Sequence, residues 1–152
     1  NGGNMDDAFE YAIANPLCNE TQDPYEAKND NCVECKSYIQ FSYCMDIPKN
    51  DQLALKEAVA LYGPVSIAIE ADKSVFKNYV GGIIKDDSCG TTLDHGVLIV
   101  GYGIENNTKY WIVKNSWGKS WGENGYVRIL RSESNDDSGT CGIGMRASFP
   151  VV

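Results

Sequence analysis

The chain has 152 residues, of which 43% are hydrophobic and 22% are charged, a composition typical of an ordinary globular protein. Thirteen lysines and arginines against 21 aspartates and glutamates give a formal net charge of −8, which disfavours nucleic acid and anionic lipid as partners. The apolar runs are far shorter than the roughly 20 residues that cross a bilayer, so no membrane span is expected. Because no methionine or leader opens the chain, we expect Asn1 to be an interior position of a longer protein.

The first part of the chain predicts one helix and a long loop. Apolar residues recur at helical spacing over Met5–Ala14, and Asn15-Pro16 ends the pattern. Residues 17–37 are rich in Asn, Asp, Cys and Pro and lack apolar periodicity, so they predict a loop that cross-links have to hold. A strand is expected around residues 38–43.

A second helix and a set of strands are expected in the rest of the chain. The helix is expected to run from Leu53 to Leu61, with Asp51 as its N-cap and Gly63-Pro64 as its end. Beyond it, short β-branched and aromatic runs separated by Gly, Asn and Asp predict an antiparallel sheet or barrel. The four expected strands are Val65–Ile69, His95–Gly101, Tyr110–Asn115 and Gly125–Leu130.

Six cysteines are many for this length, and this density is typical of disulfide-bonded proteins of an oxidising compartment. Cys32 and Cys35 have the spacing of half a zinc site, but no second close pair follows, so we expect no metal and no cofactor. The sequons Asn19-Glu-Thr and Asn106-Asn-Thr predict N-glycosylation and the same secretory route. The second sequon lies in residues 105–108, which suit a hairpin turn.

Two segments carry candidate catalytic residues. The only histidine, His95, opens an apolar strand, and twenty residues later Asn115 ends another, followed closely by Trp117 and Trp121. Taken alone, a single histidine is more often structural, and an asparagine at a strand end is ordinarily a turn residue. Together they favour chemistry, because an imidazole held by an amide oxygen under an indole ring is the general-base half of a thiol nucleophile's machinery.

The sequence around these residues resembles a known family. Leu-Asp-His-Gly-Val-Leu-Ile-Val-Gly-Tyr-Gly and Tyr-Trp-Ile-Val-Lys-Asn-Ser-Trp-Gly-Lys-Ser-Trp-Gly closely resemble segments of papain and cathepsin L-like cysteine peptidases. The opening Asn-Gly-Gly-Asn-Met and the end from Cys141 to Val151 resemble the same family, so the resemblance covers the whole chain. It implies an α+β papain-like fold, with a partial helical left domain over residues 1–47 and an antiparallel β-barrel-like right domain over residues 48–152.

The resemblance also implies a thiol endopeptidase, a hydrolase of peptide bonds. His95 would take the thiol proton and then give it to the leaving amine, while Asn115 orients the ring. Trp117 would shield their hydrogen bond from water, and Trp121 would pack beside them. The family's nucleophilic cysteine lies roughly 130 to 150 residues before the histidine and asparagine. No cysteine of this chain is therefore expected to replace it, and the chain alone is not expected to be active.

Substrate binding is implied at the start of the chain and around the histidine. The Gly2-Gly3 backbone would pair with an extended peptide, although a plain turn is the alternative. Arg146 departs from the small or apolar residue common at its position, and it either favours an acidic substrate side chain or points to solvent. The implied binding residues are Gly2, Gly3, Asn4, Met5, Ala68, Leu93, Asp94, Gly96 and Arg146.

The resemblance assigns some of the cysteines. Cys89 and Cys141 match a family disulfide, and Cys32 matches a family cysteine whose partner lies outside this chain. The other three are additional, and Cys18 paired with Cys35 or Cys44 would staple the long loop and leave an odd thiol.

Two functions remain open at this point. The chain is either part of an active endopeptidase that cleaves peptides or proteins, with the nucleophile on an N-terminal segment or light chain, or a catalytically incompetent fragment. The fragment would serve as a structural or self-associating module, because copies of itself would have to cover its exposed apolar face. Acidic composition and sequons favour a lysosomal or vacuolar location, or secretion.

Overall fold

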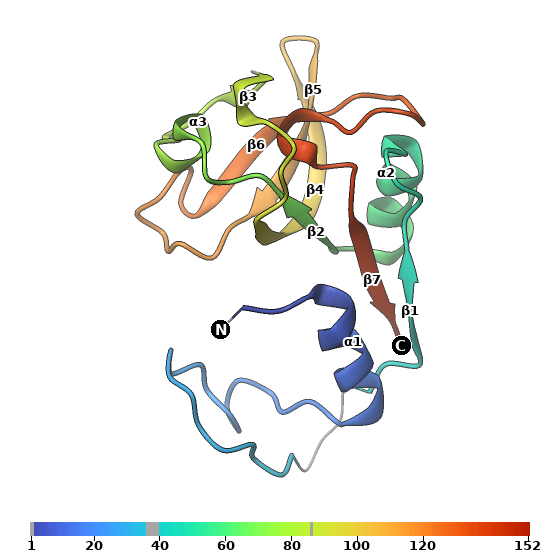
Figure 1. The fold of residues 1–152 in the computed structure, drawn as a ribbon, viewed down its shortest axis with the longest axis vertical. Helices are drawn as coiled ribbons and strands as arrows, with labels where there is room; N and C mark the ends of the chain where they lie inside the picture. Colours follow the sequence, from blue (N-terminus) through green and yellow to red (C-terminus); the bar gives the residue numbers. More distant parts are fainter. Residues whose placement is uncertain (1, 36–39, 86) are drawn as a thin grey trace. The chain divides into compact units, whose positions relative to one another are not determined.

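The computed structural model describes residues 2–35, 40–85 and 87–152, and the chain divides into two compact units (Figure 1). The first unit comprises Asn1–Met45 together with Pro150–Val152, and the second comprises Asp46–Phe149. Strand β1 (Tyr43–Asp46) and strand β7 (Ala147–Val151) each contribute residues to both units.

Helix α1 of the first unit spans Met5–Ala14, which confirms the predicted helix. Its first turn carries Asp6 and Asp7, whose negative charges suit the positive end of the helix dipole. At its end, the backbone N–H and the side-chain Nδ2 of Asn15 both donate to the carbonyl oxygen of Tyr11, each at 2.9 Å. The helix therefore stops at the position that the sequence indicated.

A long loop follows α1, and residues 20–34 of it are all exposed. A disulfide between Cys18 and Cys35 joins its two ends. The strand expected around residues 38–43 lies partly outside the described residues, at 38 and 39, and the prediction is wrong for residues 40–42. Pairing instead begins where the Ser42 N–H donates to the Val151 carbonyl at 2.7 Å, because β1 is formed by its contact with the distant β7.

Helix α2 spans Gln52–Tyr62 and packs against β2 and β4 (Figure 1). Asp51 caps it, since its carboxylate accepts the Ala54 N–H at 2.9 Å, and Gly63 follows with a φ of +98°. Leu61, expected on the apolar face, is 75% exposed. The buried apolar face consists of Leu55, Ala58 and Val59.

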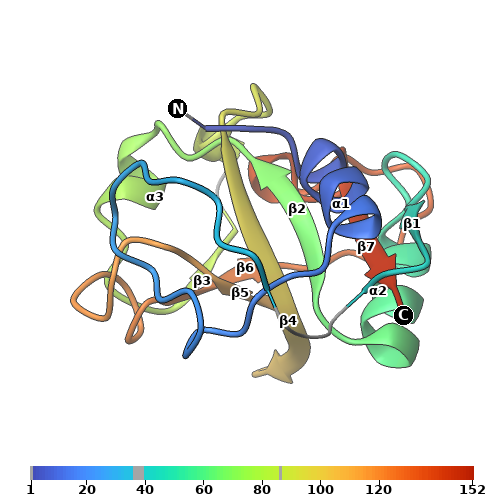
Figure 2. The ribbon, with the colours of Figure 1, turned by 90° about the horizontal axis from the view of Figure 1, so that it is seen from below.

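The four expected strands are all present, and the α+β class is confirmed. They are β2 (Val65–Ile69), β4 (His95–Glu105), β5 (Thr108–Lys114) and β6 (Tyr126–Leu130), each antiparallel to the next in this order. The full order is β1-β7-β2-β4-β5-β6-β3, with the short β3 (Ile83–Ile84) parallel to β6. Among the described residues the pairing does not close on itself, so the sheet is open and not the closed form of a barrel. Figure 2 shows β2 beside the long β4.

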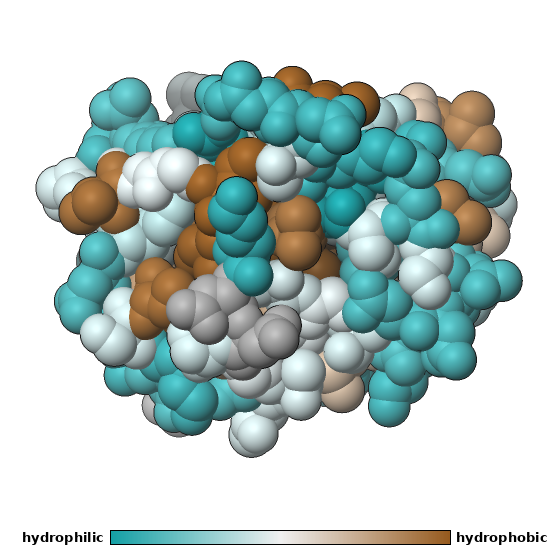
Figure 3. All heavy atoms as spheres, turned by 90° about the horizontal axis from the view of Figure 1, so that it is seen from above, coloured by the Kyte–Doolittle hydropathy of each residue, from teal (hydrophilic) through white to brown (hydrophobic). Residues whose placement is uncertain are grey.

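The core of the second unit follows the alternation of side chains along these strands. Every second residue is buried along β2 and over parts of β4, β5 and β6, because successive side chains of a strand point to opposite faces. Trp111 is the largest fully buried side chain. The buried strand residues are Val65, Ile67, Ile69, Val97, Ile99, Trp111, Val113, Val127 and Ile129. Elsewhere, the face in Figure 3 shows hydrophobic patches near its middle among hydrophilic side chains.

The hairpin between β4 and β5 turns at Asn106 and Asn107, whose φ angles are 45° and 61°. Two left-handed residues are what a two-residue turn requires to match the twist of its strands, and asparagine tolerates this conformation. Glu105 pairs with Thr108 on either side, so the predicted hairpin is confirmed.

The remaining elements are short. They are α3 (Ser74–Lys77) and the 3₁₀ helices η1 (Asp87–Cys89) and η2 (Thr140–Gly142). Among the helices of the described chain, none has the length and apolar character to cross a membrane. Nor do three or more possible metal ligands gather anywhere in the described ranges.

Candidate active site

His95 and Asn115 lie at the same end of the sheet. His95 opens β4 opposite Ile69 of β2, and Asn115 directly follows the last residue of β5. Since β4 and β5 are antiparallel neighbours, with Leu98 opposite Lys114, the start of one strand meets the end of the other. There, Nε2 of His95 lies 2.8 Å from Oδ1 of Asn115.

A second contact, made by Ser116, fixes which atom donates in this pair. The backbone N–H of Ser116 donates to Oδ1 of Asn115 at 2.8 Å, so this atom is the amide oxygen and can only accept. The proton of the pair must then be on Nε2 of His95. In the neutral ring this leaves Nδ1 as a proton acceptor, which is the arrangement of a general base.

Asn115 is held firmly but not fully satisfied. The side chain is buried, and its backbone N–H donates to the Gly125 carbonyl at 3.0 Å. Its Nδ2 is also buried, and within the described part of the chain it has no hydrogen-bond partner. A buried unpaired amide costs about 1–3 kcal/mol. The geometry at this residue thus favours the orientation of its oxygen over complete hydrogen bonding.

An aromatic cluster surrounds the pair. The Trp117 ring lies 5.2 Å from the His95 ring, and Trp121 lies 5.3 Å from Trp117, measured between centroids. Phe76 of α3, fully buried, contacts both tryptophans at 5.4 and 5.0 Å. The Trp121 Nε1–H donates to the Lys77 carbonyl at 3.1 Å. The structure thus gathers both predicted tryptophans at His95, and their shielding role stays a prediction.

Phe76 was not predicted from the sequence. It lies in the short segment Ser74-Val-Phe-Lys, which has neither a motif nor a clear apolar period. Its only signal is a large apolar residue where the surrounding sequence is polar. Tyr79, whose ring lies 5.6 Å from Trp121, was missed for the same reason.

Five of the predicted binding residues lie in the second unit. Ala68 pairs with Gly96 across β2 and β4, one register from His95, and the Ala68 N–H donates to the Arg146 carbonyl at 3.0 Å. The exposed Asp94 uses one carboxylate oxygen to accept the Ala71 N–H at 2.8 Å. These residues therefore gather at the His95 end of the sheet.

Leu93, the fifth of these residues, lies against the segment that follows Cys141. A Cβ added to Gly142 would meet the Leu93 Cδ2 at 2.8 Å and the Met145 Sδ at 3.1 Å. Glycine, with a φ of +73° there, allows this close approach. Leu93 is partly exposed and Arg146 is exposed. The arrangement suits one wall of a side-chain pocket, and that binding role stays a prediction.

The other four predicted binding residues lie in the first unit. Gly2 and Gly3 are exposed, and Gly2 has a φ of +63°, which suits the turn interpretation as well as the peptide-binding one. Asn4 is the N-cap residue of α1 without a side-chain capping bond, and Met5 is the first helical residue. Their binding roles also remain predictions.

The disulfides agree with the expected pairings. Cys89 and Cys141 are bonded and buried, as the resemblance implied. Cys18 is bonded to Cys35, which selects one of the two alternatives left open. Cys32 is an exposed free thiol, and Cys44 is a partly exposed one.

The two sequons lie in different settings. Asn106 is exposed at the tip of the β4–β5 hairpin. Asn19 is also exposed, but its Oδ1 accepts the backbone N–H groups of Thr21 and Gln22 at 3.1 and 3.0 Å. Their glycosylation stays a prediction.

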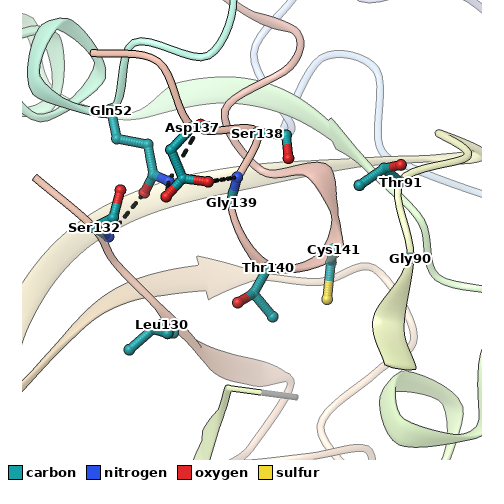
Figure 4. Close-up of a pocket in the computed structure, with 10 residues that line it drawn as sticks. All are labelled: Gln52, Gly90, Thr91, Leu130, Ser132, Asp137, Ser138, Gly139, Thr140 and Cys141. Carbon is teal, nitrogen blue, oxygen red and sulfur yellow. Dashed lines mark hydrogen bonds between the residues drawn. The ribbon is translucent and has the colours of Figure 1, made fainter. Parts of the chain in front are cut away.

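A pocket of about 370 Å³ lies elsewhere in the second unit (Figure 4). Gln52 points at Asp137 across it and donates to that carboxylate at 3.2 Å. The side-chain oxygen Oε1 of Gln52 accepts the Trp111 Nε1–H and the Ser132 N–H, both at 3.1 Å. The side-chain amide of the buried Gln52 therefore has hydrogen-bond partners for both its nitrogen and its oxygen. The bond to Trp111 joins α2 to the sheet. The lining residues are Gln52, Gly90, Thr91, Leu130, Ser132, Asp137, Ser138, Gly139, Thr140 and Cys141, none of them in the cluster around His95.

Comparison with curated proteins finds many relatives. The Germination-specific cysteine protease 1 of Arabidopsis thaliana is 46% identical over 155 residues, which cover 99% of this chain and 41% of that protein. The Oryzain beta chain of Oryza sativa subsp. japonica is 47% identical over 155 residues, covering 99% of this chain and 33% of that protein. The chain therefore spans less than half the length of these relatives.

Solved structures show the same similarity. The proform of the Amb a 11 cysteine protease, a major ragweed pollen allergen, matches with a TM-score of 0.91 and 37% identity over 99% of this chain and 47% of that one. Digestive procathepsin L 3 of Tenebrio molitor matches with a TM-score of 0.88 and 42% identity over 99% of this chain and 49% of that one. The family model described as papain family cysteine protease matches residues 1–151. The chain belongs to the papain family of cysteine proteases.

Proposed function

We propose that this chain supplies the general base and the orienting amide of a cysteine endopeptidase, while the nucleophilic thiol comes from outside these 152 residues. One observation carries the proposal. His95 Nε2 lies 2.8 Å from an Asn115 oxygen whose identity is fixed by the Ser116 N–H, so Nδ1 is left free to accept a proton.

Acylation, the first half of the proposed reaction, has two proton transfers through His95. Nδ1 accepts the proton of the cysteine thiol, and the thiolate attacks the peptide carbonyl carbon. The resulting imidazolium gives that proton to the leaving amine as the C–N bond breaks, and water then hydrolyses the acyl-enzyme. Asn115 keeps the imidazole ring of His95 in its orientation. Its oxygen also stabilises the positive charge that His95 carries between the two proton transfers.

The cysteines of this chain support an external thiol. Four of the six are in disulfides and carry no thiol, which leaves Cys32 and Cys44 as the free thiols. Neither stands in a segment that resembles the family's nucleophile motif.

Active-site labelling tests this proposal. The native protein is treated with a thiol-directed peptide electrophile, and its intact mass is measured before and after reduction. We expect the label on a cysteine outside these 152 residues. A protein that cleaves no peptide and takes no label would instead support a structural or self-associating module, and a label on Cys32 or Cys44 would contradict the external thiol.

The proposed substrates are peptides and proteins, bound in extended form along the Gly2-Gly3 backbone. Arg146 is proposed to select an acidic side chain at the second residue before the scissile bond, because its guanidinium binds a carboxylate well. A peptide library varied at that position checks this. Equal cleavage of leucine and glutamate peptides would show that Arg146 sets no preference.

We also propose a secretory route, ending in a lysosome, a vacuole or the exterior. The two disulfides among the described residues and the exposed sequons support it. Treatment of the native protein with an N-glycosidase should lower its mass, and replacing Asn106 with glutamine should remove that shift at least in part. An unchanged mass would argue against glycosylation at either sequon.

A further inference from the structure

Residues 116–125, here called the tryptophan loop, connect β5 to β6 and carry Trp117 and Trp121. We propose that Glu123, through its ion pair with Arg128, positions this loop and thereby the tryptophans and Asn115 around His95. Glu123 touches neither His95 nor Asn115 directly, so it would be a positioning residue. This inference rests on the proposed function, because it assigns a further residue to the same site.

The ion pair has a geometry suited to fixing a loop. Arg128 of β6 donates from Nε and Nη2 to the two carboxylate oxygens of Glu123, at 2.9 and 2.8 Å. Such a bidentate pair fixes direction as well as distance. The Gly82 N–H adds a third bond to Glu123 at 3.0 Å. The Arg128 guanidinium holds the pKa of Glu123 below its ordinary value, so the carboxylate is charged at neutral pH.

A short path of backbone bonds leads from Glu123 to Asn115. Glu123 and Tyr126 exchange two backbone hydrogen bonds, at 2.9 and 3.1 Å. Within that turn, the Gly125 N–H donates to the Trp121 carbonyl at 2.8 Å, and the Gly125 carbonyl accepts the Asn115 N–H at 3.0 Å. A displaced Glu123 would therefore shift the residue that holds Asn115.

The loop also has little space to move. The Trp121 ring contacts both Phe76 and Tyr79, with ring centroids 5.0 and 5.6 Å away. A Cβ added to Gly122 would lie 2.6 Å from the Tyr126 carbonyl oxygen and 3.0 Å from the Tyr79 ring, at a φ of +55°. An ion pair that fixes this turn therefore also fixes Trp121 beside it.

Tyr79 links the Glu123–Arg128 ion pair to the aromatic cluster. Its hydroxyl donates to the Gly82 carbonyl at 2.6 Å and accepts the Arg128 N–H at 3.3 Å. One side chain therefore contacts the Trp121 ring and two of the groups around the ion pair. This connection explains why a loop residue distant from His95 in sequence can affect its surroundings.

The chain offers a matched control in Glu105. This residue is the other carboxylate partner of Arg128, at 2.7 Å from Nη1, but it lies in β4 and, among the described residues, makes no hydrogen bond or ion pair with the tryptophan loop. Its side chain is 51% exposed, against 32% for Glu123. Removing either carboxylate takes one ion pair from Arg128, but only the Glu123 carboxylate belongs to the tryptophan loop.

The test compares Glu123→Gln with Glu105→Gln in the protein that contains this chain together with its thiol segment. Both are assayed well below their unfolding midpoints, with kcat, KM and the tryptophan near-ultraviolet circular dichroism as readouts. We expect Glu123→Gln to lower kcat on the order of tenfold, less than the about hundredfold that a 1 Å misplacement can cost, with little change in KM. It should also weaken the tryptophan signal, whereas Glu105→Gln leaves all three nearly unchanged.

Each other outcome would overturn the inference. Two variants with the same kcat and the same spectrum would show that Glu123 is an ordinary surface ion pair. A lower kcat with an unchanged tryptophan signal would show that the loop had not moved. If the unmodified protein cleaves no peptide, the proposed function fails by itself, and the spectra of the two variants still decide whether Glu123 positions the loop.

Discussion

Different interactions stabilise each of the two units of the chain. In the second unit, alternating side chains of four paired strands form a core around the fully buried Trp111. In the first unit, Ala12 is the only buried residue among those the structure describes, and the Cys18–Cys35 disulfide closes the exposed loop. A unit with a close-packed core can hold its side chains in fixed positions, whereas a unit with little core depends on its cross-link.

The largest effect is expected at the site that the second unit holds. Replacing His95 with alanine should lower kcat/KM of the protein that contains this chain by on the order of a thousandfold or more, because the proposed thiol nucleophile would lose its base. The fold should persist, since the side chain is only partly buried. Peptide hydrolysis and thermal unfolding, measured on the same preparation, check this. A variant that keeps more than a tenth of the activity would contradict the assignment of His95.

The core itself should be the next most sensitive place. Replacing Trp111 with alanine removes a fully buried ring and its bond to Gln52, and should lower the free energy of unfolding by about 3–5 kcal/mol. The control is Tyr25→Ala in the first unit, where the side chain is 85% exposed and the expected change is within about 0.5 kcal/mol. Denaturant titrations compare them, and similar losses for both would remove the contrast between the units.

The Cys18–Cys35 disulfide should affect the stability of the first unit only. Replacing both Cys18 and Cys35 with serine opens a loop closed over a sequence separation of 17, which is expected to cost about 3 kcal/mol of local stability. Limited proteolysis should then cut within residues 20–34 faster, while amide exchange in β4 and β5 stays slow. Equal loss of protection in the strands would mean that the units do not differ in this way.

The strands and helices were predictable where the signal is local. Asp51 and Gly63 marked the ends of α2, and alternation marked β2. By contrast, β7 contains Pro150 and forms by pairing with distant segments, while β3 has only two residues, so neither carries a pattern of its own. Similarly, His95 and Asn115 stand in long motifs, whereas Phe76, Tyr79 and Glu123 acquire their importance only through tertiary contacts.

A smaller effect is expected from acid on the Glu123–Arg128 pair. Because the pKa of Glu123 is lowered in the folded protein from its ordinary value of 4.5, the pair stabilises the fold fully above that pH. Its contribution is lost as the pH falls through the lowered pKa. The difference in unfolding midpoint between the unmodified protein and Glu123→Gln should therefore shrink on acidification below 4.5. A difference that grows instead would reverse the sign of this linkage.

The most direct measurement concerns the proton on His95. The 152 residues contain a single histidine, so a long-range ¹H–¹⁵N spectrum of the labelled chain reports on one imidazole ring. The structure predicts the proton on Nε2, bonded to the Asn115 oxygen, and a mixture of the two tautomers when Asn115 is replaced with alanine. A neutral ring with its proton on Nδ1 in the unmodified chain would contradict the account, because no acceptor would then face the thiol.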